Sequence, residues 1–109
     1  MSGMLDGIRV VEVSMWAFVP AAATLLAEWG ADVIKVEGPD GDPVRGLLNA
    51  GVPIEGPTYT WELWNRGKRG IALDLTRSGG RDVLHELVAR ADVFVTLSLI
   101  HISEPTRPY

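Results

Sequence analysis

The chain has 109 residues, the size of one ordinary domain or of a piece of a larger one. Hydrophobic residues make up 47% of it, which suffices for a packed core, and the formal net charge of −4 argues against a nucleic-acid-binding surface. Because there is no cysteine, disulfides and thiolate metal ligands are excluded. We find neither a signal peptide nor an apolar run of the about 20 residues that cross a membrane, and therefore expect a cytoplasmic protein without membrane partners.

The first forty residues predict two strands joined by a helix. Residues 8–13 (IRVVEV) and 31–37 (ADVIKVE) are short apolar segments rich in β-branched side chains. Residues 20–29 (PAAATLLAEW) predict a helix, with Pro20 in its first turn and Gly30 as its left-handed terminator. Because nearly all residues of this helix are apolar, we expect it to be buried on most sides.

The rest of the chain repeats the alternation of strand and helix after a long loop. In chain order we expect a loop over 38–56 with a turn near 44–48, a short helix within 57–65, a basic turn over 66–70, a strand over 71–75, a helix over 76–90 and a strand over 91–96. This order predicts an α/β fold with a Rossmann-like, doubly wound parallel sheet. Ligands bind such sheets at the carboxyl ends of the strands, which here are residues 14–19 and those from Glu37 onward.

A dinucleotide site is the first function that this topology invites. It requires a G-x-G-x-x-G turn after the first strand, so that the backbone can approach a pyrophosphate. Residues 14–21 contain no glycine. Glu37 ends the second strand, where an acidic residue would bind a ribose, but without the glycines we favour a structural role for it.

The turn after the first strand instead presents an apolar and aromatic patch, residues 15–19 (MWAFV). Such side chains usually pack into a core or an interface, and from the residues alone we favour that interpretation. The alternative is a surface for a flat heterocycle such as adenine.

Basic residues near the strand ends form a second candidate feature: Arg45, Arg66, Lys68 and Arg69. Arginine binds phosphate groups through two hydrogen bonds at once. The alternative is an ordinary solvated turn, which we favour for any one of these residues. His85 lies on the polar side of its helix, and we expect it to be solvated. The residues predict no paired carboxylates, metal-ligand cluster or nucleophile–base pair.

Three motifs, GADVIKVE, GDPVR and NRGKRGIALDL, give the chain a specific resemblance. In this order and spacing they resemble the N-terminal part of the family III CoA-transferases, over residues 5–96. That family includes formyl-CoA and carnitine-CoA transferases and, by relatedness, α-methylacyl-CoA racemase. The resemblance implies a larger two-domain enzyme whose two chains interlock in a homodimer.

The resemblance also implies a chemistry. The transferases use a carboxylate that attacks an acyl-CoA thioester, with acyl-CoA and a carboxylic acid as substrates and no further cofactor. The catalytic aspartate of the family lies downstream of residue 96, so we expect residues 1–96 to be an inactive N-terminal fragment. The alternatives are a racemase of α-methylacyl-CoA, in which a histidine and an aspartate transfer protons, and a non-catalytic CoA-binding α/β module.

By position, the resemblance implies that several residues contact CoA. They are Trp16, Ala17, Phe18, Gly38, Arg45, Leu73 and Thr76. Gly38 stands where transferases often have an arginine for the CoA phosphates, and Arg45 is a candidate substitute. Thr76 replaces a lysine that some members have.

The tail over residues 97–109 does not fit the fold. A crossover helix should follow the last strand, whereas LSLIHISEPTRPY is short, polar and contains two prolines. Residues 97–107 resemble one reading frame of a transposase-end sequencing adapter. We hypothesise that this tail is not native, so that His101, Ser103 and Glu104 carry no functional weight.

Overall fold

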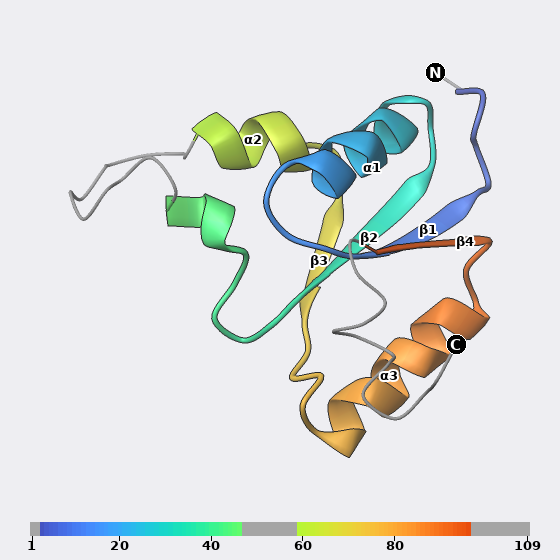
Figure 1. The fold of residues 1–109 in the computed structure, drawn as a ribbon. Coiled ribbons are helices and arrows are strands. Elements are labelled where there is room, and N and C mark those ends of the chain that lie inside the picture. Colours follow the sequence, from blue (N-terminus) through green and yellow to red (C-terminus); the bar gives the residue numbers. More distant parts are fainter. Residues whose placement is uncertain (1–2, 47–58, 97–109) are drawn as a thin grey trace.

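The computed structural model describes residues 3–46 and 59–96 (Figure 1). Its elements in chain order are β1 (Arg9–Val13), α1 (Phe18–Glu28), β2 (Asp32–Glu37), the 3-10 turn η1 (Pro43–Gly46), α2 (Tyr59–Asn65), β3 (Arg69–Ala72), α3 (Ser78–Ala89) and β4 (Val93–Thr96). All neighbouring strands pair in parallel, in the order β3-β2-β1-β4. The predicted α/β fold with a parallel sheet is therefore confirmed.

Helices cover both faces of the sheet, with α1 and α2 on one face and α3 on the other (Figure 1). Successive side chains of a strand point to opposite faces, which divides the core into two clusters. Val10 and Val33 pack with Ala23 of α1. On the other face, Val11 and Val36 pack with Leu84 of α3. The central strands are thus covered on both sides, as predicted for residues 31–37.

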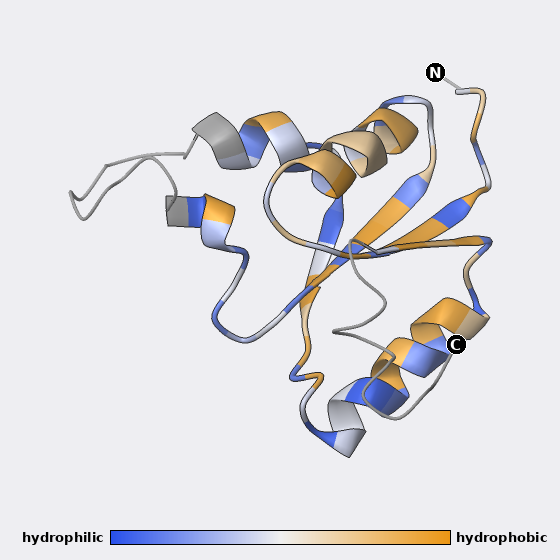
Figure 2. Cartoon of the chain, viewed as in Figure 1, coloured by the Kyte–Doolittle hydropathy of each residue, from blue (hydrophilic) through white to orange (hydrophobic). Residues whose placement is uncertain are grey.

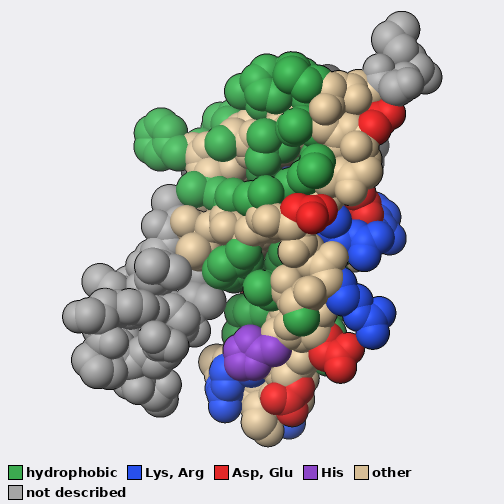
Figure 3. All heavy atoms as spheres, turned by 90° about the vertical axis from the view of Figure 1, so that its right-hand side faces the viewer, with side chains coloured by type: hydrophobic (Ala, Val, Ile, Leu, Met, Phe, Trp, Pro, Cys, Tyr) green, Lys and Arg blue, Asp and Glu red, His purple; other side chains and the backbone are tan. Residues whose placement is uncertain are grey.

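The outer face of α1 departs from the prediction that this helix is buried on most sides. Its buried residues are Pro20, Ala23 and Thr24, whereas Phe18 and Leu25 are 88% and 48% exposed. The helix is hydrophobic along most of its length (Figure 2). Seen from the side, hydrophobic side chains gather in the upper part of the molecule, and charged ones lie along the right-hand side and in the lower part (Figure 3). The apolar sequence of α1 therefore leaves an apolar surface among the residues that the structure describes.

Glycines end or connect the elements where the backbone turns back. Gly30, at φ 105°, follows the last turn of α1, and Pro20 lies in the first turn of that helix, both as predicted. The boundaries of β3 differ from the expected residues 71–75. The strand begins at Arg69, since it pairs with β2 from Ile34 onward, so part of the predicted basic turn is strand. Within the predicted basic turn, the chain reverses its direction at Gly67, which has φ 79°.

Some expectations fall outside the described residues. They concern most of the loop over 38–56, the first residues of the segment 57–65, and the tail over 97–109. The predicted turn near 44–48 is observed as η1. Within 3–46 and 59–96, no helix is long and apolar enough to cross a membrane.

Candidate functional site

A pocket of about 410 Å³ opens at the carboxyl ends of β1, β2 and β3. Its size is within the range of small-molecule sites. The walls come from three segments that each follow a strand: Val13, Ser14 and Met15; Val36, Glu37, Gly38, Pro39, Gly41 and Asp42; Leu73, Asp74, Leu75 and Thr76. The sheet topology therefore places this pocket where ligands of such sheets bind.

The structure brings together three of the seven predicted CoA contacts. Gly38, Leu73 and Thr76 all line the pocket, although they come from separate loops. Trp16, Ala17, Phe18 and Arg45 are not among its lining residues. From the turn after β1, the pocket is lined instead by Ser14 and Met15.

The turn between β1 and α1 has an unusual backbone. Trp16 has φ 69°, in the left-handed region that residues other than glycine rarely adopt. Its N–H donates a hydrogen bond to Asp42 Oδ1 at 3.1 Å. Met15, Trp16 and Phe18 are 46%, 44% and 88% exposed, so packing of this patch into the core of the described residues is wrong. Packing in an interface, or against a heterocycle, stays a prediction.

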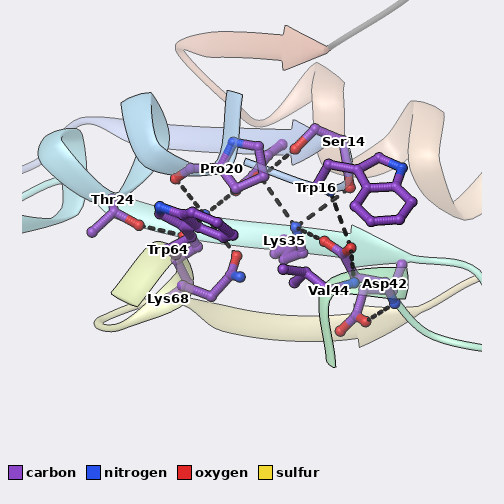
Figure 4. Close-up of polar contacts among 12 residues, drawn as sticks. Ser14, Trp16, Pro20, Thr24, Lys35, Asp42, Val44, Trp64 and Lys68 are labelled. Carbon is purple, nitrogen blue, oxygen red and sulfur yellow. Dashed lines mark hydrogen bonds and ion pairs between the residues drawn. The ribbon is translucent and has the colours of Figure 1, made fainter. Parts of the chain in front are cut away.

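Beside the pocket lies a cluster of four buried charges, which sequence reasoning missed (Figure 4). The side chains of Glu12, Lys35, Asp42 and Lys68 are each at most 2% exposed. Lys35 Nζ lies 3.0 Å from Asp42 Oδ2 and 3.3 Å from Glu12 Oε2, and Lys68 Nζ lies 2.7 Å from Glu12 Oε1. Two positive and two negative charges thus neutralise one another in a region without water access, the arrangement that buried charges require.

Lys68 connects this cluster to the helices. Its Nζ donates to the carbonyl oxygens of Pro20 and Trp64, both at 3.0 Å, and to Asn65 Oδ1 at 2.9 Å. Burial lowers the pKa of Lys68 below its ordinary value, although Glu12 opposes this effect. The interpretation of Lys68 as a solvated turn residue is therefore wrong.

Arg66 and Arg69 lie at the surface and pair with carboxylates. Arg66 binds Glu28 of α1, and Arg69 Nη2 lies 2.7 Å from Asp32 Oδ2. His85 is exposed on α3, as expected. Arg66 and Arg69 are both exposed, in agreement with the favoured interpretation that they are solvated, and neither lines this pocket, where the other possibility, phosphate binding, would have placed them.

Arg45 and Glu37 form a two-point ion pair beside the pocket. Arg45 Nε and Nη2 donate to the two carboxylate oxygens of Glu37 at 2.9 and 2.7 Å. The guanidinium also stacks on the ring of Trp61, 3.6 Å from its centre. Hydrogen bonds from Arg45 lower the pKa of Glu37 and raise that of Arg45. The favoured structural role of Glu37 agrees with this geometry.

The sequence contained one signal for the missed cluster. Glu12 and Lys35 interrupt the two most apolar strands, and in the observed register they face each other directly. A charge of each sign at matching positions of two buried parallel strands predicts an ion pair between them.

The arrangement is suited to binding rather than to acid–base chemistry. Ser14 Oγ donates to Glu12, whose two carboxylate oxygens already pair with Lys35 and Lys68 and which is not among the residues that line the pocket. Within the described residues, no three histidine, aspartate or glutamate side chains are grouped as metal ligands.

Comparison with known proteins identifies the family. The sequence profile described as CoA-transferase family III matches residues 5–98. The chain belongs to this family. It is 37% identical, over 97 residues, to cinnamoyl-CoA:phenyllactate CoA-transferase of Clostridium sporogenes, covering 87% of this chain and 24% of that protein. It is 44% identical, over 91 residues, to the succinyl-CoA–L-malate CoA-transferase beta subunit of Chloroflexus aurantiacus, covering 82% and 22%.

A solved structure shares the fold. A CaiB/BaiF family protein from Brucella suis superposes with a TM-score of 0.84 at 34% identity, covering 100% of this chain and 30% of that one. The chain therefore spans roughly a quarter of the length of the curated relatives that it matches. The predicted family and fold are confirmed.

Proposed function

We propose that this chain provides a CoA-binding part of an enzyme that moves CoA from an acyl-CoA to a carboxylic acid. The observation that carries the proposal is the pocket at the strand ends, in which Gly38, Leu73 and Thr76 come together as the family resemblance implies. The names of several similar relatives pair a CoA thioester with a carboxylic acid, such as formyl-CoA with oxalate.

The lining suggests which end of CoA the pocket holds. Val13, Val36 and Leu73 supply apolar walls, and Gly38 leaves open space because a Cβ there would meet nothing within 4 Å. The lining contains Glu37, Asp42 and Asp74 but no lysine or arginine among its described residues. An apolar slot without cations suits the adenine ring and disfavours phosphates, so the phosphates would lie outside it.

The chemical step requires a nucleophilic carboxylate from elsewhere in the enzyme. In the proposed reaction this carboxylate attacks the thioester carbonyl carbon, the C–S bond breaks, and CoA leaves as its thiolate. We propose that the catalytic aspartate belongs to a part of the enzyme beyond these 109 residues, and that the chain alone does not exchange CoA. A cytoplasmic homodimer remains our prediction for the complete enzyme.

Binding of CoA to the chain tests the pocket directly. Leu73→Glu places a negative charge in the apolar wall, and we expect CoA affinity in calorimetric titration to fall about tenfold or more. Val83→Glu, on the exposed side of α3 and not among the residues that line this pocket, is the matched control. Circular dichroism checks that both variants fold. Equal affinity of Leu73→Glu and the unsubstituted chain would show that CoA does not use this pocket.

The type of reaction is tested with the protein from a gene that continues uninterrupted beyond codon 96. It is incubated with an acyl-CoA and a ¹³C-labelled carboxylic acid, and we expect the labelled acyl group to appear in the CoA thioester pool. Solvent deuterium at the α-carbon of the acyl-CoA, without transfer of the label, would instead identify the racemase alternative.

A further inference from the structure

The cluster of buried charges touches two walls of the pocket. Asp42 belongs to the loop that follows β2, and its side chain is 0% exposed. Ser14 and Met15 belong to the turn that follows β1. All three residues line the pocket, so contacts between the loop and the turn determine its shape.

The two carboxylate oxygens of Asp42 have separate roles. Oδ1 accepts hydrogen bonds from the N–H groups of Trp16, at 3.1 Å, and Val44, at 3.0 Å. Oδ2 lies 3.0 Å from Lys35 Nζ. The carboxylate therefore connects the turn after β1 to a lysine fixed in the centre of the sheet (Figure 4).

Lys35 is itself held by the end of β1. Its Nζ contacts Glu12 Oε2 at 3.3 Å and the carbonyl oxygen of Ser14 at 3.4 Å. Ser14 in turn donates its hydroxyl hydrogen to Glu12. Because these charges are buried, none of them can exchange its partner for water without a large penalty. The side chain of Asp42 is therefore held by the sheet as well as by its own loop.

The backbone of Trp16 is the group that needs this support. Its φ of 69° is unfavourable for a residue with a side chain, and such conformations persist only where the surroundings impose them. The hydrogen bond from its N–H to a buried, charged acceptor is the contact that opposes relaxation of the turn. Relaxation would move Met15, the adjacent residue, away from its place in the pocket wall.

We infer that Asp42 is a positioning residue that holds Trp16 in the left-handed conformation and thereby fixes Ser14 and Met15 as a wall of the pocket. The consequence for CoA affinity rests on the proposed function. The geometry makes a specific prediction: the role of Asp42 should vanish where residue 16 needs no support. Glycine adopts positive φ readily, so Trp16→Gly removes that need.

A double-mutant cycle on CoA affinity tests this inference. We expect Asp42→Ala to weaken CoA binding about tenfold in the chain that keeps Trp16, and less than about threefold in the Trp16→Gly background. The cycle cancels any direct contact of the Trp16 ring with CoA. Asp42→Asn keeps an oxygen acceptor for the two N–H groups, and we expect it to retain most of the affinity.

The control is Asp32→Ala, which removes an ion-paired aspartate at the opposite end of β2. We expect its CoA affinity to equal that of the unsubstituted chain. An equal loss from Asp42→Ala in both backgrounds, or a loss in Asp32→Ala as large as in Asp42→Ala, overturns the inference. So does a loss in Asp42→Asn as large as in Asp42→Ala.

Hydrogen exchange of the Trp16 amide, followed by NMR, separates this inference from the proposed function. We expect Asp42→Ala to exchange this proton faster, with Asp42→Asn and Asp32→Ala unchanged. If the unsubstituted chain does not bind CoA, the proposed function fails. The exchange rate of the Trp16 amide then tests the positioning role of Asp42 independently of CoA. Unchanged exchange in Asp42→Ala overturns it.

Discussion

The carboxylate of Glu37 is shared between a side chain and the backbone of the loop that follows it. Arg45 donates to both of its oxygens, and the N–H of Asp42 donates to Oε2 at 2.7 Å. These contacts hold the pKa of Glu37 below its ordinary value of 4.5, with the Arg45 hydrogen bond as the largest cause. Ionised Glu37 therefore stabilises the fold at every pH at which it keeps its charge.

Replacing Glu37 tests this contribution and its pH dependence. A lowered folded-state pKa means that the stabilisation is present above about pH 4.5 and is lost as the pH falls through the folded-state value. We expect Glu37→Gln to lower the free energy of unfolding by about 1 kcal/mol near neutral pH, a modest value because Arg45 is half exposed. Urea unfolding at neutral pH and at about pH 3 measures the free energy of unfolding of the variant and of the unsubstituted chain at each pH.

At the acidic pH, the difference in stability between the variant and the unsubstituted chain should be smaller than at neutral pH. Glu86→Gln is the matched control, because its ion pair with Arg90 on α3 is exposed on both sides and should contribute little at either pH. A stability difference for Glu37→Gln that stays constant between the two pH values would contradict the role of its charge.

The predicted site residues differ in how well the sequence located them. Gly38 and Thr76 follow predicted strands and Leu73 lies in the middle of one, so the sheet rule was enough to bring them to one edge. By contrast, the sequence did not predict that the charged side chains of Asp42 and Lys68 are buried. Both follow turn residues and have the composition of solvated loops, and their burial arises only when two helices and two strands meet. Local sequence carries little information on such tertiary contacts.

At the scale of whole elements, the start of α3 depends on a close backbone approach. A Cβ on Gly80 would overlap the carbonyl oxygen of Asp74, which belongs to the pocket lining. A Cβ on its neighbour Gly79 would meet nothing within 4 Å. Two adjacent glycines of one helix therefore differ completely in their tolerance of a side chain.

This pair of glycines gives a matched test. We expect Gly80→Ala to lower the free energy of unfolding by about 1–3 kcal/mol, because the helix must move away from the loop. Gly79→Ala should raise it by about 0.5–1 kcal/mol, because alanine has the better helix propensity. Thermal unfolding followed by circular dichroism measures both. Equal effects of the two substitutions would refute the close approach.

Most elements of the fold were predictable from their periodicity, while their ends were not. The helices and strands all exist, because apolar runs and helical stripes are local signals. Arg69 and Gly70 look like a turn but extend β3, since pairing with β2 rather than local preference decides where an edge strand begins. The helix α1 begins at Phe18, two residues before the expected position 20.

At the scale of the whole molecule, apolar side chains are unevenly distributed. Leu25 of α1 and Leu63 of α2 are 48% and 55% exposed, and the two helices lie on the same face of the sheet (Figure 1). Two strands, β3 and β4, also form open edges in the described sheet. Exposed apolar patches and open edges favour association between copies of a chain. We therefore expect this chain to self-associate in solution.

Polar substitutions on the α1–α2 face test the cause of this association. We expect Leu25→Gln combined with Leu63→Gln to shift the sedimentation profile towards the monomer, with a change in unfolding free energy of at most about 1 kcal/mol. Val83→Gln, on α3 across the sheet, is the control and should leave association unchanged. If the unsubstituted chain is a monodisperse monomer that melts cooperatively, the expected self-association is contradicted.

The pair of Glu12 and Lys35 has one more consequence, for how the strands find each other during folding. A slip of β1 along β2 by two residues is the smallest that keeps the same side chains facing the core. Such a slip would set Glu12 opposite Glu37 in one direction and opposite Val33 in the other. The first juxtaposes like charges and the second buries a charge without a partner. Strands made only of valine and isoleucine would pair in either shifted register at little cost. Glu12 and Lys35 therefore disfavour the shifted registers and help to select the observed one.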